Sequence, residues 1–199
     1  MKNCLVELVV IIDKSGSMGG LESDVIGGFN SLITEQRKNE GEVNVTTILF
    51  DHEISYVNKS ENIKSIKEMT KRDYIPSGCT ALLDAIGSGI SYINTKCLTL
   101  KEEERPQNVI FSIMTDGYEN SSREYSYEQI KNMIENKKKE GWDFIFQAAN
   151  IDVAKEGDRL GIAAEDMAKF EPTDDGIRYS FCMANSMISN KIKKGKKTK

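Results

Sequence analysis

The stretch that most constrains the fold runs from residue 8 to residue 18 and reads Leu-Val-Val-Ile-Ile-Asp-Lys-Ser-Gly-Ser-Met. A continuous run of aliphatic, mostly β-branched residues is typical of a strand buried on both faces, as in a parallel sheet. The run ends in three oxygen-bearing side chains, Asp13, Ser15 and Ser17. Because ligands of open α/β sheets bind just beyond the carboxyl ends of the strands, this turn is the first candidate for a binding site.

The spacing of these three side chains favours a cation. Residues two apart in an extended segment point to the same side, so Asp13, Ser15 and Ser17 can converge on one point. Gly16 lets the backbone bend between the two serines. Converging hard oxygens suit Mg²⁺, Mn²⁺ or Ca²⁺ rather than Zn²⁺ or copper. The same residues could instead form only a turn that caps the next helix, and the motif alone leaves both interpretations open.

Strand-like and helix-like patterns alternate along most of the chain. Further apolar runs with strand character lie at residues 43–50, 54–57, 109–114, 142–148 and 167–170. Apolar residues spaced three and four apart predict helices over residues 21–33, 61–69, 80–93, 127–140, 153–160 and 172–188. The helix over 127–140 has the clearest start, because Ser126 and Gln129 form a capping-box pattern.

One connection between strands is too short to hold a helix. Only Asp51, His52 and Glu53 separate the strands over 43–50 and 54–57, so this pair is expected to be an antiparallel hairpin at the sheet edge. The other strands are connected mainly through helices, which predicts parallel pairing with helices on both faces. The predicted fold class is therefore α/β, a doubly wound, mostly parallel six-stranded sheet with one antiparallel edge strand.

Length and charge predict one domain and a short basic tail. A chain of 199 residues without a linker-like stretch has the size of one domain. The last nine residues hold six lysines, and removing their charges from the net charge of −4 leaves −10 on the rest. We therefore predict a domain over residues 1–190 and a basic tail over 191–199. The tail is interpreted as a solvated chain end, with contact to nucleic acid, anionic lipid or an acidic partner as the alternative.

Cysteine usage and the N-terminal pattern predict a cytoplasmic protein. The cysteines are widely spaced and include no C-x-x-C pair: Cys4, Cys79, Cys97 and Cys182. The first apolar run is interrupted by Glu7 and ends in Asp-Lys rather than in a small-residue cleavage site, unlike a signal peptide. No segment approaches the ~20 apolar residues that span a bilayer, so no membrane partner is expected.

Oxygen ligands on separate segments are predicted to meet. The strand over 109–114 ends in Thr-Asp-Gly, which repeats the pattern of an apolar run followed by a carboxylate and a glycine. Thr80 adds a hydroxyl at the start of a helix. The carboxyl ends of parallel strands share one edge, so the sequence predicts a single metal site there. Its candidate ligands are Asp13, Ser15, Ser17, Thr80 and Asp116.

The order and spacing of these five residues resemble the metal-ion-dependent adhesion site (MIDAS) of von Willebrand factor A (vWA) domains. The resemblance extends over essentially the whole chain and implies a Rossmann-like sheet with a divalent ion, usually Mg²⁺, at its top. It also implies that Ser15, Ser17 and Thr80 contact the ion directly, and that Asp13 and Asp116 hold it directly or through water. Mg²⁺ takes six oxygens, so one position stays open for an Asp or Glu of a protein partner.

The resemblance further implies an intracellular adaptor of the bacterial or phage type. Relatives of that type are thought to act beside AAA+ ATPases or with kinases and phosphatases. We also predict the roles of three residues near the site. Cys79, at a position where the family often has Gly, is expected to fill space or to make the site redox-sensitive. Glu119 is expected to be a solvated loop acid that could compete for the open position. His52 is expected to be exposed.

Two other functions are considered. An Asp after the first parallel strand, with Mg²⁺ nearby, is also typical of phosphohydrolases that use an aspartyl nucleophile, here Asp13. That chemistry usually needs a second carboxylate two residues on, where this chain has Ser15, so we predict that the chain is not an enzyme. An adaptor that binds nucleic acid through its lysine tail is disfavoured by the acidic body.

Overall fold

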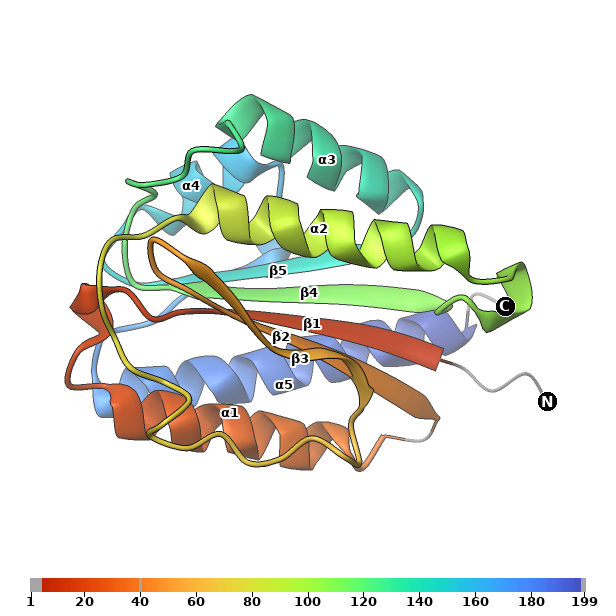
Figure 1. Ribbon diagram of the computed structural model, residues 1–199, viewed down its shortest axis with the longest axis horizontal. Helices are drawn as coiled ribbons and strands as arrows, with labels where there is room; N and C mark the ends of the chain where they lie inside the picture. Colours follow the sequence, from red (N-terminus) through yellow and green to blue (C-terminus); the bar gives the residue numbers. More distant parts are fainter. Residues whose placement is uncertain (1–4, 40, 198–199) are drawn as a thin grey trace.

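The computed structural model describes residues 5–39 and 41–197 and has a six-stranded sheet between two layers of helices (Figure 1). The strands are β1 (Leu5–Asp13), β2 (Glu42–Phe50), β3 (Ile54–Asn62), β4 (Asn108–Thr115), β5 (Asp143–Ala148) and β6 (Met167–Lys169). The helices are α1 (Glu22–Gln36), α2 (Leu82–Thr99), α3 (Tyr127–Lys139), α4 (Val153–Leu160) and α5 (Asp174–Lys197). Three short 3₁₀ turns accompany them: η1 (Gly16–Met18), η2 (Glu102–Glu104) and η3 (Ala164–Asp166).

The sheet has the strand order β3-β2-β1-β4-β5-β6. β1 pairs in parallel with both β2 and β4. The pairs β4–β5 and β5–β6 are also parallel, and the pair β2–β3 is antiparallel. The predicted fold class is confirmed, including the antiparallel hairpin at the sheet edge. Because the order of the chain reverses at β1, the connections after β1 and β4 run to opposite sides and leave a ligand position at the carboxyl ends of these strands.

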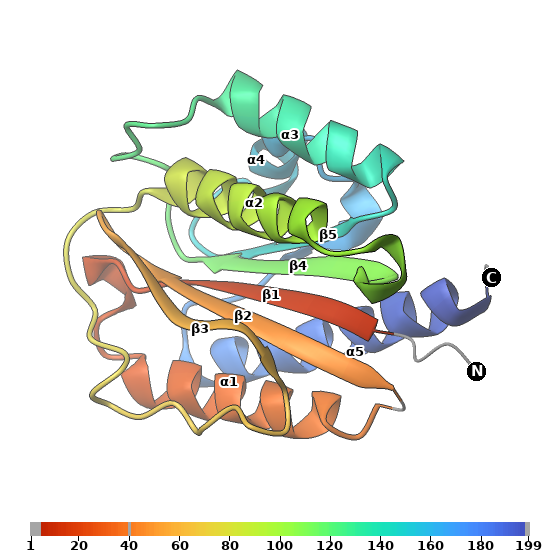
Figure 2. The same cartoon turned by 45° about the vertical axis from the view of Figure 1, so that its right-hand side comes forward.

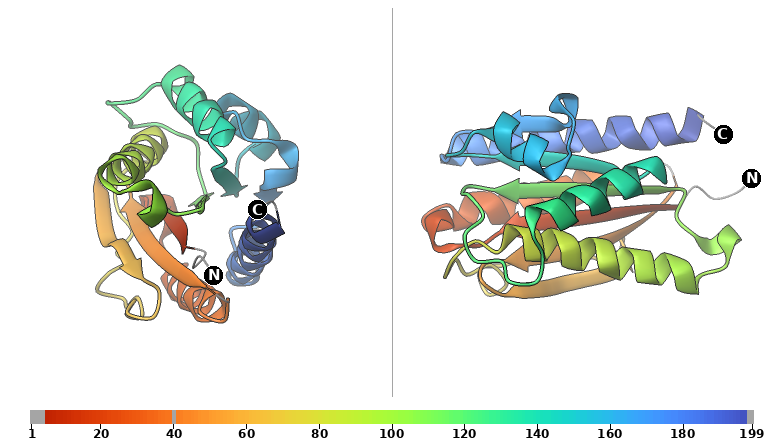
Figure 3. Two further views of the ribbon diagram at one scale, coloured as in Figure 1. Left: turned by 90° about the vertical axis from the view of Figure 1, so that its right-hand side faces the viewer. Right: turned by 90° about the horizontal axis from the view of Figure 1, so that it is seen from above.

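The first apolar run is continuous because β1 is covered on both faces. Leu8, Val10 and Ile12 lie in a core with α1 and α5. Val9 and Ile11 point the other way, into a core with α2, α3 and α4. Figure 2 and the end-on view in Figure 3 show α1 and α5 below the sheet and α2 and α3 above it. This double cover fixes the end of β1 rigidly at the edge where the candidate ligands lie.

Residues 61–69 form no helix, so that prediction is wrong. β3 continues to Asn62, a turn over residues 63–65 follows it, and residues 66–70 have no regular secondary structure. Ile63, Ile66 and Met69 are buried at a spacing of three, which gives the sequence its helical appearance. Their segment is instead held by one side chain of α1, Asn30, and by Arg37, which directly follows α1. Arg37 donates through Nε to the Ile63 carbonyl (3.0 Å), and Asn30 exchanges two hydrogen bonds with the Met69 backbone (3.0 and 2.8 Å).

α5 continues through the boundary expected at residue 190. Lys191 Nζ bridges Asp143 (2.9 Å) and Asp166 (2.7 Å), and Ile192 is buried. These contacts raise the pKa of the Lys191 ammonium, although burial alone would lower it. The helix runs on to Lys197, and the side chains beyond residue 193 lie outside the described residues. Among the described helices, none combines the length and apolar character needed to cross a membrane.

Two adjacent glycines of α1 predict opposite effects of the same substitution. A Cβ atom on Gly28 would lie 2.1 Å from the Phe181 ring of α5, whereas one on Gly27 would meet nothing within 4 Å. We expect Gly28→Ala to destabilise the fold by about 1–3 kcal/mol through overpacking. Gly27→Ala should instead add up to about 1 kcal/mol, because alanine favours a helix. Urea unfolding of both variants tests this, and equal effects at the two positions would contradict the packing described.

Candidate metal centre

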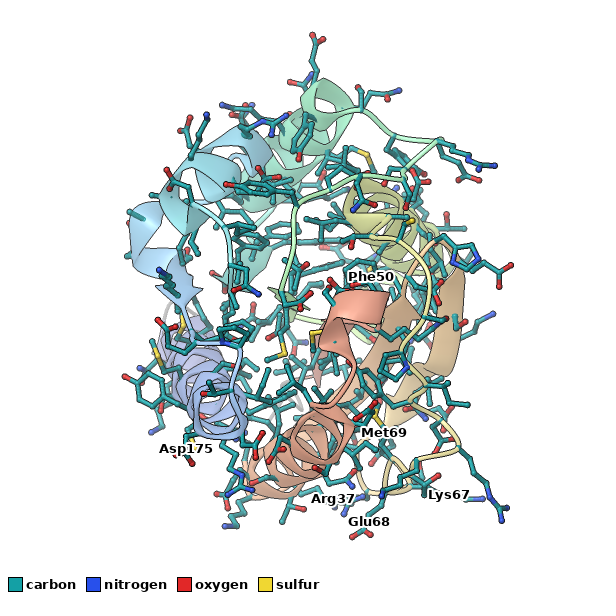
Figure 4. All side chains as sticks on the ribbon, turned by 90° about the vertical axis from the view of Figure 1, so that its left-hand side faces the viewer. Arg37, Phe50, Lys67, Glu68, Met69 and Asp175 are labelled. Atoms are coloured by element: carbon teal, nitrogen blue, oxygen red, sulfur yellow. The ribbon has the colours of Figure 1, made fainter. Side chains whose placement is uncertain are left out.

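The turn after β1 is built around the Asp13 carboxylate. Asp13 Oδ1 accepts a hydrogen bond from the Ser15 backbone N–H (2.7 Å), and Asp13 Oδ2 accepts one from the Thr115 hydroxyl (2.6 Å). The chain then enters η1, where Gly16 N–H donates to the Gly78 carbonyl (3.1 Å). Asp13 thus joins the end of β1 to the end of β4, and the turn is held against the segment before α2. Figure 4 looks onto this edge of the sheet, with η1 in front.

Hydroxyl and carboxylate groups from the two strand ends form a short chain of hydrogen bonds. Ser15 Oγ and Ser17 Oγ lie 3.1 Å apart. Ser17 Oγ donates to Asp116 Oδ1 (2.6 Å), across a separation of 99 residues in the sequence. Ser15 and Asp116 are buried, whereas Ser17 is exposed. The opening to solvent is therefore on the Ser17 side of the cluster.

Thr80 is brought to the same place by its backbone. Its N–H donates to Asn120 Oδ1 (2.8 Å), and its carbonyl accepts from Asn120 N–H (3.0 Å). A Cβ atom built on Gly117 would lie 3.8 Å from Thr80 Oγ1, so the hydroxyl faces the turn that follows Asp116. Within the described part of the chain the Thr80 hydroxyl has no hydrogen-bond partner. The structure therefore joins Asp13, Ser15, Ser17 and Asp116 through hydrogen bonds and sets the Thr80 hydroxyl against the turn that follows Asp116.

The two carboxylates of the cluster lack a positive partner. Asp13 and Asp116 are 0% and 2% exposed, and none of the ion pairs among the described residues involves either one. Burial raises the pKa of Asp13; hydrogen bonds from Thr115 and Ser15 oppose this, and the charge of Asp116 adds to it. Burial likewise raises the pKa of Asp116, against the hydrogen bond from Ser17. Both carboxylates would gain from a bound cation.

Lys14, which directly follows Asp13 in the sequence, pairs with a different carboxylate. Lys14 forms an ion pair with Asp51, at the end of β2, and Asp51 also accepts from the Ser77 hydroxyl (2.8 Å). Burial opposes ionisation of Asp51, but the bonds from Lys14, Glu53 N–H and Ser77 outweigh it and lower the Asp51 pKa. The positive charge inside the motif therefore neutralises a neighbouring carboxylate and leaves Asp13 and Asp116 without one.

The donor set suits a hard divalent ion. The five candidate ligands offer only carboxylate and hydroxyl oxygens, the atoms that Mg²⁺, Mn²⁺ and Ca²⁺ prefer. Among the described residues, no three His, Cys, Asp or Glu side chains gather into a group that could hold a metal ion, so a site here depends on hydroxyl ligands beside Asp13 and Asp116. The described cysteines Cys79, Cys97 and Cys182 are free thiols, and Cys79 is exposed beside Thr80.

Substituting Asp116 by asparagine should stabilise the ion-free protein at neutral pH. A carboxyl pKa that is raised in the folded state means that the charged form weakens folding above the unfolded pKa. Asparagine is neutral and can still accept the Ser17 hydrogen bond. We expect the melting temperature of Asp116→Asn, measured with a chelator at pH 7, to exceed that of the parent by about 2–4 °C per kcal/mol gained. The gain should vanish below pH ~3.9, where both side chains are neutral.

The exposed Asp175→Asn variant is the control for this measurement. It should not raise the melting temperature at any of these pH values, because Asp175 is exposed in the first turn of α5, where its charge favours the helix by about 0.3–1 kcal/mol. A lower or equal melting temperature for Asp116→Asn at pH 7 would show that the Asp116 charge is not destabilising.

Several residues that sequence reasoning missed hold the site in place. Tyr74 is buried, and its hydroxyl donates to the Asp13 carbonyl (2.6 Å). Burial and the charges of Asp13 and Asp116 raise the Tyr74 pKa well above its usual range, so the hydroxyl remains a donor. Asn120 fixes Thr80, as described above. The sequence offered only weak signals, namely a lone aromatic in a polar loop and an asparagine shortly after the Asp116 motif.

Glu119 is a structural residue rather than the solvated acid that was expected. Its carboxylate accepts from the backbone N–H groups of Leu83 (2.9 Å), Ser121 (2.8 Å) and Ser122 (2.7 Å). Asp84, in the first turn of α2, binds in the opposite direction, from the helix to the loop. It accepts from three backbone N–H groups of the loop before α3, those of Arg123, Glu124 and Tyr125, at 2.8 to 3.0 Å. Together, Glu119 and Asp84 tie the start of α2 to the loop that carries Asp116.

The sheet order and the cluster at its carboxyl edge define the class of protein, an α/β domain with the vWA fold. No protein-family model and no curated protein sequence matches the chain, so the likeness is one of fold. Manganese-loaded TRAP of Plasmodium vivax is similar, with a TM-score of 0.67 and 18% identity over 96% of this chain and 75% of that chain. The vWF domain of the pili tip protein Mfa5 from Porphyromonas gingivalis gives 0.67 and 12% identity over 96% and 97%.

A third similar structure is proximal thread matrix protein 1 from the mussel byssus, solved with a zinc-occupied MIDAS motif. It gives a TM-score of 0.59 and 15% identity, over 93% of this chain and 47% of that one. The chain thus spans about half the length of the mussel protein but nearly all of the Mfa5 domain. These likenesses establish the vWA fold.

Proposed function

We propose that this chain is a divalent-metal-dependent protein-binding module, in which a partner carboxylate completes the coordination of a bound Mg²⁺ ion. One observation carries the proposal: two buried carboxylates, which have no counter-charge among the described residues, lie beside three hydroxyls that open to solvent at Ser17. The proposed ligands are Asp13, Ser15, Ser17, Thr80 and Asp116. Mn²⁺ or Ca²⁺ could take the place of Mg²⁺, and the manganese and zinc forms of the similar structures support a divalent ion in general.

The charges explain why a partner acid could bind. Ser15, Ser17 and Thr80 are neutral hydroxyls that cancel none of the charge of a divalent ion, while Asp13 and Asp116 would hold it directly or through water. Both Asp13 oxygens already accept hydrogen bonds from the protein, which favours contact with the ion through water. The ion would therefore keep an affinity for one more carboxylate at its open position.

We infer binding rather than catalysis from the position of Asp13. A carboxylate that is 0% exposed, with a hydrogen bond on each oxygen, is poorly placed to attack a phosphorus atom. Ser15 also stands where an aspartyl phosphohydrolase would need its general acid. Binding of nucleic acid through the C-terminal lysines has less support, because Lys191 is used in ion pairs with Asp143 and Asp166.

For the partner, we propose a protein of the cytoplasm that presents an exposed Asp or Glu. The resemblance of the motif to bacterial and phage adaptors supports an AAA+ ATPase or a kinase or phosphatase system as the setting.

Chelation tests the proposal. The purified chain is immobilised, and proteins from a bacterial lysate are bound in Mg²⁺ and then eluted with a chelator. We expect a specific set of proteins to be retained by the parent chain and lost with Asp116→Ala. Calorimetric titration with Mg²⁺, Mn²⁺ and Ca²⁺ should show one site in the parent and none in the variant. Retention of the same proteins in the presence of chelator would contradict a metal-dependent interface.

A further inference from the structure

One exposed apolar side chain lies beside the metal centre. Ile75 is 63% exposed, although an isoleucine gains from burial. It directly follows Tyr74, whose hydroxyl binds the Asp13 carbonyl (2.6 Å). Nothing in the packing of the domain explains why an isoleucine is presented to solvent at this place.

Ile75 forms one wall of a hollow next to the site. The hollow has a volume of about 310 Å³, and we call it the Ile75 pocket; its lining residues are Glu22, Ser23, Lys71, Tyr74, Ile75 and Pro76. It lies between the start of α1 and the segment that leads to α2. Tyr74, Ile75 and Pro76 supply apolar walls, and the remaining lining residues are polar, with Glu22 and Lys71 of opposite charge. The exposed Ile75 side chain would gain most from contact with a large apolar side chain of a partner.

The Ile75 pocket and the metal centre share a wall. The segment of residues 74–78 runs along the turn after β1, with Ser77 N–H bound to the Lys14 carbonyl (2.8 Å) and Gly16 N–H bound to the Gly78 carbonyl (3.1 Å). Figure 4 shows this segment passing beside η1 on its way to α2. The pocket therefore borders the segment that is bound to the turn after β1, so one partner segment can contact both the ion and the pocket.

We propose that the partner recognised at this site is a segment with an acidic residue at the ion and a large apolar residue, at a fixed spacing from it, in the Ile75 pocket. This inference rests on the proposed function and adds the second specificity element to it. The ion selects any accessible Asp or Glu, whereas the pocket selects among acidic segments by their neighbouring side chain. Apolar anchors in pockets commonly dominate the affinity of such interfaces.

A random-peptide display library selected on the immobilised chain in Mg²⁺ and eluted with chelator tests the proposal. We expect the recovered peptides to carry an Asp or Glu and a large apolar residue at one spacing. A synthetic peptide of that sequence should bind Ile75→Ser about tenfold or more weakly than the parent. Leu98→Ser is the matched control: Leu98 is 70% exposed, lies near the end of α2 away from the site, and should leave affinity unchanged.

A double-mutant cycle makes the assignment specific. Replacing the apolar residue of the peptide by alanine should weaken binding to the parent but have little further effect on Ile75→Ser, because the two side chains form one contact. Mg²⁺-dependent acidic peptides without an apolar preference, bound equally by the parent and Ile75→Ser, would overturn the inference and leave the proposed function standing. Failure to recover any Mg²⁺-dependent peptide would count against the proposed function, and the inference would fall with it.

Discussion

The double variant Ser15→Ala with Asp116→Ala is expected to lose the rise in melting temperature that Mg²⁺ gives the parent protein. An ion that binds only the folded state stabilises it by about 2.7 kcal/mol at a concentration one hundred times its dissociation constant. For a domain of this size, that corresponds to a rise of roughly 5–11 °C. The variant removes one proposed hydroxyl ligand and one proposed carboxylate ligand, and thermal melts with and without Mg²⁺ measure the difference.

The matched control is Ser31→Ala with Asp175→Ala, two exposed residues of the same types away from the cluster. The control should respond to Mg²⁺ as the parent does. Both double variants should show the parent's circular dichroism spectrum, because the first removes polar contacts at one edge of the sheet and no apolar core. An equal Mg²⁺ response in all three proteins would mean that the ion binds elsewhere.

The second large effect is expected for Asp84→Ala. Three backbone N–H groups would lose their charged acceptor, which we expect to cost about 3–5 kcal/mol, and about 6–20 °C in melting temperature. The loop that carries Asp116 would also lose one of its two ties to α2, so the affinity for Mg²⁺ should fall although Asp84 is not a proposed ligand. Melting curves and calorimetric titration measure the two effects on one preparation.

Asp84→Asn refines this test, since its side chain keeps one oxygen acceptor. We expect it to lie between the parent and Asp84→Ala in both stability and Mg²⁺ affinity. If Asp84→Ala lowers stability but leaves the Mg²⁺ affinity of the folded protein unchanged, then the tie between α2 and the loop does not position the site.

The strands and the cluster could be predicted because each depends on local patterns. β1 is covered on both faces, which requires an unbroken apolar run. The residue at which this run stops marks the carboxyl end of β1 in the sequence. The ligand candidates then follow from oxygen-bearing residues at such ends. Ser126 and Gln129 predicted the start of α3 for a similar reason, since the capping box is a contact within one turn.

The features that could not be predicted depend on partners distant in the sequence. The segment after β3 has apolar residues at a helical spacing, but Asn30 of α1 and Arg37, which follows α1, bind its carbonyl and N–H groups without a helix. Glu119 and Asp84 bind backbone N–H groups of segments that the fold alone brings near. A single polar residue gives no sign in the sequence of which backbone it will contact.

The ion pairs of Lys191 make the first lysine of the predicted basic tail part of the folded domain. Lys191 fastens the last helix to β5 and to the turn before β6, and the neighbouring Ile192 is buried. A deletion that begins at residue 191 would therefore expose apolar surface and invite aggregation, whatever the tail binds. Shortened versions of the chain that end after residue 193 would keep these anchors while removing most of the terminal positive charge, so solubility and tail function could be studied apart.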